Sequence, residues 1–263
     1  MSSHPQRIAD YEIVEVEGPA TNGWFYLAIP PARLGLTAER VVVKVIDNSG
    51  IGLERFGREL RAFAEIASPH LVQLYDAGQQ DNQLFYAMEW CPLGSLAHGT
   101  FSKAAVIRAV AGAARAAHAL HEGGVAHRDI EPRNVLVTDG GGKLRDLGLV
   151  RAADPHASMS MMPSADAIEF IDPWLLKGES PSRASDLYAL GATLHFALCG
   201  RSLFGDLPSD PLGAIRHVLR NAPQVDETLD ADLAAVIGRC VDQNQSERFS
   251  STAELADALE ALS

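Results

Sequence analysis

The sequence is poor in the features that mark secreted, zinc-stapled and membrane-spanning proteins. Its 263 residues include only three cysteines, Cys91, Cys199 and Cys240, and none belongs to a CxxC pair. This usage argues against a disulfide framework or a structural zinc site and fits a reducing compartment. No apolar run is long enough to span a membrane, and the N-terminus lacks the apolar segment of a signal peptide. We therefore expect a cytoplasmic chain that makes no membrane contact of its own.

Positive charge is also scarce. The chain has 22 Lys and Arg against 34 Asp and Glu, which gives a formal net charge of −12. The phosphate backbone of nucleic acids repels such a chain, so we expect no nucleic-acid partner. The remaining composition, 47% hydrophobic and 21% charged, is ordinary for a globular protein. The length suffices for one large domain or two lobes.

Residues 11–89 are predicted to form a small, mostly antiparallel β-lobe with one helix. Short β-prone runs alternate with Gly/Pro-rich connections, and one segment between them has apolar residues at helical spacing. The expected strands are residues 11–16, 23–28, 40–46, 71–75 and 84–89, and the expected helix is 54–66.

Residues 90–263 are predicted to form a larger, mainly helical lobe. The sequence Pro92-Leu93-Gly94 breaks the strand pattern and indicates the boundary between the lobes. The long irregular stretch 151–168 is typical of a functional or disordered loop. The expected helices are 104–121, 186–199, 212–220, 231–241 and 251–262, with a hairpin over 135–144. The prediction is an α+β fold in which residues 1–263 form one bilobal domain.

Five polar residues occur in an order and spacing that matter together: Lys44, Glu59, Asp129, Asn134 and Asp146. The lysine ends a Val-Val-Val-Lys run, and the glutamate falls on the predicted helix. The first aspartate closes a His-Arg-Asp motif, the asparagine follows five residues later, and the second aspartate opens Asp-Leu-Gly. Each residue alone has an ordinary structural interpretation, as a solvated lysine or a turn aspartate. Their joint occurrence is what points to a function.

This set resembles the motifs of protein kinases, most closely the bacterial Ser/Thr kinases, from about residue 11 to residue 262. Segments 186–191, 200–204 and 247–250 resemble the family's DxWSLG, GxxPF and ExRPS landmarks. Small-molecule kinases of the aminoglycoside type lack this C-terminal set. The resemblance therefore favours a protein kinase over a small-molecule phosphotransferase.

The resemblance implies a role for each member of the set. Lys44 would hold the α- and β-phosphates of ATP, and Glu59 would orient it through an ion pair. Asp146 would bind Mg²⁺, with Mn²⁺ as an alternative, and Asn134 would bind the second ion. Asp129 would accept or orient the proton of a Ser or Thr hydroxyl. The implied nucleotide site comprises Gly18, Ala20, Gly23, Phe25, Val42, Lys44, Met88, Glu89, Cys91 and Leu136.

Several positions depart from the family pattern around the nucleotide. Ala20 replaces the second glycine of the glycine-rich loop, and Val42 replaces the usual alanine above adenine. Glu131 replaces a lysine that faces the γ-phosphate, where a carboxylate would be repulsive by several kcal/mol at ~4 Å with an effective dielectric of about 20. Two remedies are open. Glu131 turns to solvent, or Arg133, at a position where many tyrosine kinases carry an arginine, compensates for the missing lysine.

The segments that would contact the protein substrate depart further from the family pattern. Trp174 stands where the family has a glutamate that pairs with a late arginine, here Arg248. This arginine needs another partner, because an unpaired buried charge is costly. Ala167 replaces the threonine that helps to seat the acceptor.

Three functions therefore stay open at this point. The first is an ATP- and Mg²⁺-dependent Ser/Thr protein kinase acting on a protein substrate, which is favoured because all five polar residues survive. The second is a pseudokinase that binds nucleotide or docks a signalling partner. Its support is the set of changes at Ala20, Val42, Glu131, Ala167 and Trp174. The third, a small-molecule phosphotransferase, has the least support.

Overall fold

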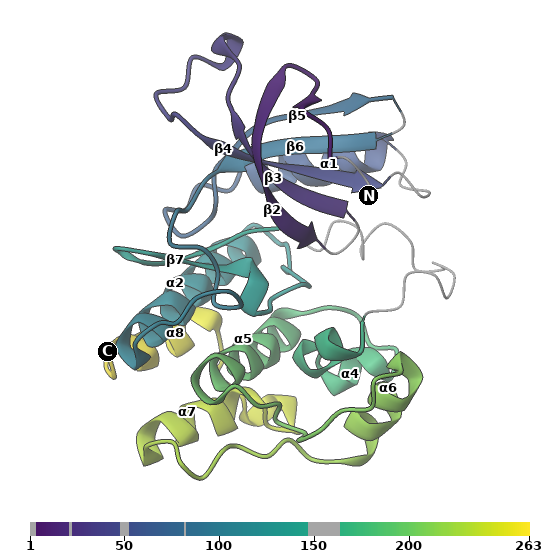
Figure 1. The fold of residues 1–263 in the computed structure, drawn as a ribbon. Coiled ribbons are helices and arrows are strands. Elements are labelled where there is room, and N and C mark those ends of the chain that lie inside the picture. The colour runs from purple at the N-terminus through teal and green to yellow at the C-terminus, as the bar shows by residue number, and fades with distance from the viewer. Residues whose placement is uncertain (1–3, 21–22, 48–52, 82, 147–163) are drawn as a thin grey trace. The chain divides into compact units, whose positions relative to one another are not determined.

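The structure, a computed structural model, describes residues 4–20, 23–47, 53–81, 83–146 and 164–263 (Figure 1). The chain divides into two compact units. The N-unit takes the described residues up to Glu65 together with Val72–Pro92. The C-unit takes Ile66–Leu71 and the described residues from Leu93 onward. No helix in the described ranges is long and apolar enough to cross a membrane.

The N-unit is built on a six-stranded antiparallel sheet with the strand order β1-β2-β3-β4-β6-β5. One helix, α1 (Leu53–Ala64), accompanies the sheet. The strands are β1 (Arg7–Ile8), β2 (Tyr11–Ala20), β3 (Gly23–Ile29), β4 (Val41–Asp47), β5 (Leu74–Gln80) and β6 (Gln83–Glu89). These elements match the expected small β-lobe with one helix.

The two faces of β4 have different tasks, because successive side chains of a strand point to opposite sides. Val41, Val43 and Val45 pack into a buried cluster with Tyr11, Phe85 and their neighbours. Val42 and Lys44 lie on the other face and are also buried. The β-prone run thus buries Lys44 among the apolar residues of this strand.

The prediction of a strand at 71–75 was wrong in its boundaries. The strand β5 begins at Leu74 and continues to Gln80, whereas Leu71 makes only an isolated bridge to Leu144 in the C-unit. Leu71 and Val72 are apolar because they are buried, not because they belong to the sheet. The polar end of β5 has weak strand propensity, but it pairs in register with β6 from Ala77 to Gln80.

The C-unit is mainly helical, as expected. Its helices are α2 (Lys103–Glu122), α4 (Pro173–Leu176), α5 (Arg183–Cys199), α6 (Pro211–Arg220), α7 (Ala231–Cys240) and α8 (Thr252–Glu260). Short 3₁₀ turns cover Pro132–Asn134, Ala165–Phe170 and Gln245–Glu247, and a hairpin joins β7 (Val135–Thr138) to β8 (Gly141–Leu144). Helix α5 starts three residues before the expected position because Ser182 and Ser185 form a capping box at its N-terminus.

The β7–β8 hairpin lies directly against α2, and small residues make this possible. A Cβ atom added at Gly142 would lie 2.0 Å from the backbone oxygen of Ala109, and one at Gly112 would lie 2.4 Å from the oxygen of Gly142. The alanine- and glycine-rich surface of α2 therefore fixes the hairpin at backbone contact distance. Because Asn134 precedes β7 and Asp146 follows β8, this packing also positions two of the expected site residues.

Candidate active site

Lys44 of the N-unit is held between aromatic rings. In the sheet it pairs with Phe25 of β3 and Tyr86 of β6. Its Nζ atom lies 5.3 Å from the Phe25 ring centroid and 5.8 Å from that of Tyr86. An ammonium group at this distance from an aromatic face is attracted by the electron-rich ring. The side chain of Lys44 is thereby positioned on one face of the sheet, where it is 3% exposed.

The same face carries three other residues of the implied nucleotide site. Val42 pairs directly with Met88 and lies two residues from Lys44, so Phe25, Val42, Lys44 and Met88 share one side of the sheet. All four are buried. The structure therefore brings together this half of the predicted nucleotide site.

The other predicted nucleotide residues of the N-unit lie on adjoining segments. Gly18 and Ala20 belong to β2, and Gly23 opens β3. A Cβ atom at Gly23 would lie 1.9 Å from the oxygen of Val45, so this glycine is required by the close approach of β4. Glu89 ends β6 and accepts a hydrogen bond from the backbone N–H of Gln73, and Cys91 is buried just beyond it. Residues 21–22, between β2 and β3, lie outside the described residues.

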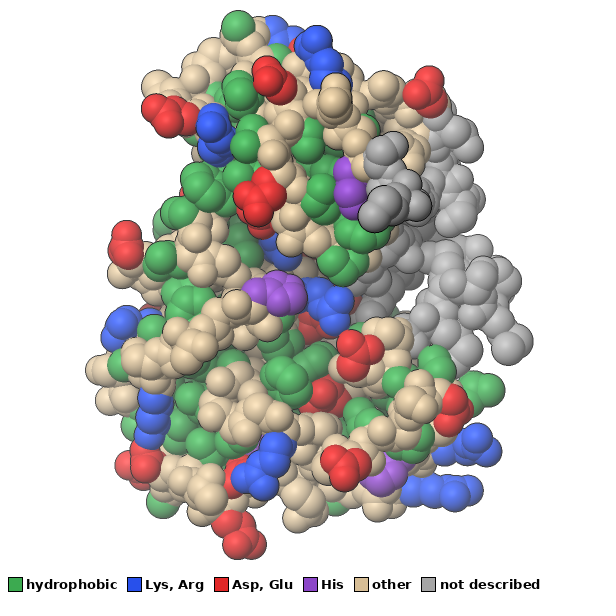
Figure 2. Space-filling model, viewed as in Figure 1, with side chains coloured by type: hydrophobic (Ala, Val, Ile, Leu, Met, Phe, Trp, Pro, Cys, Tyr) green, Lys and Arg blue, Asp and Glu red, His purple; other side chains and the backbone are tan. Residues whose placement is uncertain are grey.

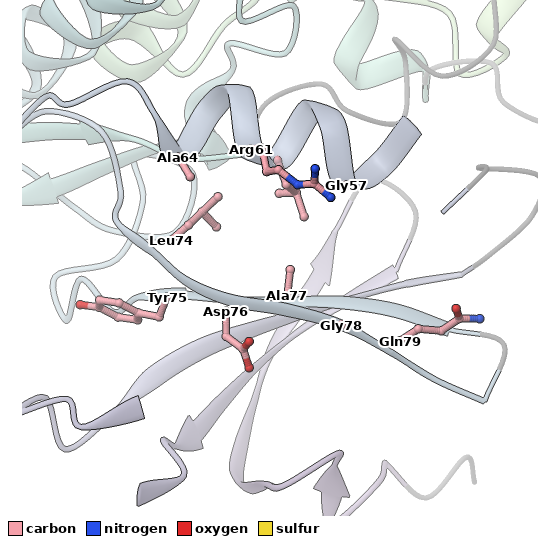
Figure 3. A pocket seen from close by; sticks show the side chains of 10 residues that line it. Gly57, Arg61, Ala64, Leu74, Tyr75, Asp76, Ala77, Gly78 and Gln79 are labelled. Carbon is pink, nitrogen blue, oxygen red and sulfur yellow. The ribbon is translucent and has the colours of Figure 1, made fainter. Parts of the chain in front are cut away.

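Glu59 belongs to α1, but its side chain lies outside the described part of the structure, so its predicted ion pair with Lys44 stays a prediction. A pocket of about 520 Å³ lies between α1 and β5 (Figure 3). Helix residues such as Leu60 and Arg61 line one side, and Leu74–Gln79 line the other. None of its described lining residues is one that the sequence assigned to the nucleotide.

In the C-unit, the carboxylate of Asp186 anchors the segment 127–134, which carries the His-Arg-Asp motif and Asn134 and is called the catalytic loop below. Its Oδ2 accepts hydrogen bonds from the backbone N–H of His127 at 2.8 Å and from Nε2 of His121 at 2.7 Å. Its Oδ1 accepts one from the backbone N–H of Arg128 at 3.0 Å. Arg128 has a positive φ of 71°, a strained conformation that the two N–H contacts hold in place. Asp186 thus tethers the backbone at His127 and Arg128, and His121 is a buried core histidine.

His127 connects the loop to the segment before Asp146. Its Nε2 lies 3.1 Å from the carbonyl of Arg145, and its Nδ1 lies 3.3 Å from the backbone N–H of Asp129. Burial lowers the pKa of His127 below its usual value, against the opposing charges of Asp186, Asp129 and Asp146. The ring is therefore neutral, with Nε2 as the donor and Nδ1 as the acceptor.

Asn134 and Asp129 form the centre of this site. The Nδ2 of Asn134 donates to the backbone oxygen of Asp129 at 2.8 Å and to its Oδ2 at 3.1 Å. The backbone oxygen of Asn134 accepts from the N–H of Arg145, which brings Asp146 next to the pair. Asp146 is buried and has a positive φ of 67°. Two carboxylates and an amide oxygen form a donor set that suits a hard divalent cation such as Mg²⁺.

Glu131 forms an ion pair with Arg133 in the structure. Of the two remedies left open by the sequence, the turning of Glu131 to solvent is wrong, because this residue is 3% exposed. Its Oε1 lies 3.0 Å from Nε of Arg133, whose Nη2 lies 3.6 Å from Oδ2 of Asp166. The guanidinium is partly exposed and the glutamate is not. An ion pair thus occupies the region where the sequence lacks the usual lysine.

Comparisons with known proteins agree with this arrangement. The family model described as the protein kinase domain matches residues 31–259. The chain belongs to the protein kinase domain family. The kinase domain of PknI from Mycobacterium tuberculosis, solved as a C20A mutant, is 27% identical, with a TM-score of 0.69 over 99% of both chains. The bilobal α+β kinase fold is therefore confirmed.

Two curated relatives come from bacteria. The kinase domain is 30% identical to the serine/threonine-protein kinase PknK of Mycobacterium tuberculosis over 95% of this chain and 23% of the relative. It is 30% identical to the probable serine/threonine-protein kinase pknA2 of Bifidobacterium longum over 78% of this chain and 28% of the relative. The chain thus spans about a quarter of the length of these relatives. A protein kinase domain implies, in general, the use of ATP with a divalent metal.

Arg248 is paired with a carboxylate, but this carboxylate belongs to Asp172 and not to residue 174. Arg248 is 3% exposed, and its Nη1 lies 2.6 Å from Oδ2 of Asp172. Nη1 also donates to the carbonyl of Ala184 at 2.8 Å, and Nε donates to that of Asp242 at 2.9 Å. Asp172 stands two residues before Trp174, so the carboxylate is retained although its position in the sequence has changed. Sequence reasoning missed Asp172, although an aspartate before the proline of a helix start is a capping signal.

Glu169 lies in the segment expected to seat the acceptor. It is 5% exposed, and burial raises its pKa to about 7, against a hydrogen bond from Ser202 that lowers it. Its neighbour Ala167 is also buried. The kinase domain therefore carries a carboxyl group that changes charge near neutral pH.

The paired Asp172 and Arg248 give a stability prediction. Asp172→Ala should lower the free energy of unfolding by about 3–5 kcal/mol, because it leaves a buried guanidinium without its carboxylate. Urea denaturation measures this difference. Asp10→Ala, which removes the exposed partner of Arg33, is the control and should cost under about 1 kcal/mol. Equal losses in the two variants would contradict the assigned partnership.

Glu169 gives a pH prediction. The folded state holds a proton on Glu169 up to about pH 7, whereas the unfolded carboxyl loses it near 4.5. The wild type should therefore lose stability relative to Glu169→Gln as pH rises from 5 to 8, by about 1–3 kcal/mol. Unfolding curves of both proteins at several pH values measure this difference. Parallel pH dependences would show that Glu169 does not titrate differently on folding.

Proposed function

We propose that this chain is a Ser/Thr protein kinase domain that transfers the γ-phosphate of ATP to a hydroxyl group of a protein substrate. The observation that carries the proposal is the hydrogen-bonded pair of Asn134 and Asp129 beside Asp146. The relatives named above are serine/threonine kinases, and their names support the choice of acceptor.

Asp129 is proposed as the catalytic carboxylate. The amide of Asn134 holds one of its oxygens, which orients the group to accept or direct the proton of the attacking hydroxyl. The tether at Asp186 fixes the backbone just before Asp129, and Nδ1 of His127 accepts a hydrogen bond from the backbone N–H of Asp129 itself. Phosphoryl transfer depends on such positioning more than on covalent chemistry by the protein.

Each unit contributes residues that are proposed to bind the cofactor. Asn134 and Asp146 would bind Mg²⁺, with Mn²⁺ as an alternative, and the ion would supply neutralisation of phosphate charge. Lys44 would bind the α- and β-phosphates, with Glu59 as its orienting partner. Gly18, Ala20, Gly23, Phe25, Val42, Met88, Glu89, Cys91 and Leu136 are proposed to surround the nucleotide.

Arg133 is proposed to compensate for the missing lysine. Its side chain is 32% exposed and lies between buried Glu131 and exposed Asp166. A fixed cation near a transferring phosphoryl group stabilises the charge of the transition state. Glu131 then positions Arg133 instead of repelling the phosphate.

Replacing the carboxylate tests the catalytic role of Asp129. Asp129→Asn should reduce phosphate transfer from γ-labelled ATP by about 10²–10⁴-fold, because it removes the proton acceptor. Labelling of the chain itself and of a generic protein substrate, with Mg²⁺ and with Mn²⁺, measures the loss. The control is Asp139→Asn at the exposed tip of the hairpin, which should label like the wild type.

Two outcomes would contradict the proposal. Equal labelling by Asp129→Asn and the wild type would refute the role of Asp129. A wild type whose melting temperature rises with Mg-ATP, but which transfers no phosphate, would instead be a nucleotide-binding pseudokinase.

A further inference from the structure

A second pocket lies in the C-unit, among α4, the end of α6 and the segment 241–248. Its volume is about 500 Å³, and its lining includes Trp174, Lys177, Tyr188, Arg220 and Arg248. Among the described residues that line it, none is proposed for catalysis or nucleotide binding. The pocket is therefore distinct from the proposed active site.

The pocket contains the position that lost its glutamate. Because Asp172 forms the ion pair with Arg248, the side chain at position 174 is not needed as its partner. Its indole is half-buried, and its Nε1 donates to the carbonyl of Gln243 at 3.0 Å. The Nζ of Lys177 lies 4.9 Å from the ring centroid. The substitution has replaced a carboxylate with an apolar wall that holds a cation beside it.

The pocket lining carries positively charged side chains, although the chain as a whole has a formal net charge of −12. Lys177 and Arg220 are exposed on the rim, and neither forms an ion pair within the described residues. Arg248 contributes a third cationic side chain, already neutralised by Asp172. None of the described residues that line the pocket is acidic. Lys and Arg side chains are visible over α6 at the lower right of Figure 2. Two exposed cations without carboxylates beside them favour an anionic ligand.

The wall of the pocket also contains an unsatisfied hydroxyl. Tyr188 is 1% exposed, and its buried hydroxyl has no hydrogen-bond partner in the described part of the chain. Burial raises the pKa of this phenol, so it remains protonated and can donate. A buried donor without an acceptor is unfavourable, and an acceptor group on a ligand would remove that cost.

The end of α6 indicates what kind of molecule carries the anion. The last carbonyl groups of a helix have no intrahelical partners, and Val218–Arg220 bring these acceptors to the pocket. An anion without a proton, such as chloride or sulfate, cannot donate to them, whereas the backbone N–H groups of a peptide can. A peptide with carboxylate side chains would match both the carbonyls and the cations.

We propose that this pocket docks an acidic, extended segment of a protein partner. Carboxylates of the segment pair with Lys177 and Arg220, and one oxygen accepts from the hydroxyl of Tyr188. The aliphatic parts of the segment pack on Trp174. Docking does not require phosphate transfer, so it can fail or succeed independently of the proposed kinase activity.

The fluorescence of Trp174 reports binding directly. In the full chain with Trp24→Phe and Trp90→Phe, Trp174 is the only remaining indole. The probe is an acetylated and amidated peptide of alternating glutamate and leucine, titrated at low salt. It should cause a saturable change, whereas the matched lysine–leucine peptide and free glutamate should cause none at equal concentration.

Variants locate the binding. Lys177→Glu combined with Arg220→Glu should weaken the acidic peptide at least tenfold, because two attractions become repulsions. The matched control is Arg216→Glu, an exposed α6 residue outside the pocket lining, which should bind like the parent. Tyr188→Phe should weaken binding several-fold without lowering the melting temperature, since its hydroxyl has no hydrogen-bond partner among the described residues.

Three results would overturn the docking site. Equal binding of the acidic and lysine peptides would remove the charge argument. Free glutamate binding as tightly as the peptide would show a small-anion pocket instead. Unchanged affinity in the double charge reversal would place the peptide elsewhere on the protein.

Discussion

The catalytic loop of this kinase domain depends on one buried carboxylate. Asp186, in the first turn of α5, accepts two backbone N–H groups from the loop and an imidazole N–H from α2. It is 1% exposed, so these three donors are what makes its burial tolerable. The carboxylate thereby joins two helices to the loop that holds Asp129. Without it, the positive φ of Arg128 would lose its support.

Around this fixed loop, the unusual residues have changed in compensating groups. Glu131 is buried because Arg133 lies against it, and Arg248 stays buried because Asp172 has replaced the usual glutamate. In both places the charge is balanced although the sequence motif is not. A change in a sequence motif is therefore weak evidence about function by itself. The residue that the new side chain contacts in the structure is stronger evidence. The same reasoning explains why Trp174 became available to line a pocket.

Much of this arrangement was predictable from the sequence. Physical reasons explain why the rest could not be predicted. The fold follows from short β-prone runs before Glu89 and helical spacing after Pro92, and the motif spacing indicated Asp129, Asn134 and Asp146. The partner of Arg248 was missed because pairing in three dimensions is not limited to motif positions. The start of β5 was misplaced because burial makes Leu71 apolar without strand pairing. The side chain of Glu59 lies outside the described part, so its role rests on the resemblance alone.

The most direct test is amide hydrogen exchange at His127 and Arg128 in Asp186→Asn, measured together with phosphate transfer. The NH₂ group of an asparagine at this position would face one of the N–H donors that the carboxylate now accepts. Both loop amides should exchange at least tenfold faster, transfer should fall, and the amides within α2 and α5 should keep their protection. If transfer falls while His127 and Arg128 stay protected, Asp186 is not what positions the catalytic loop.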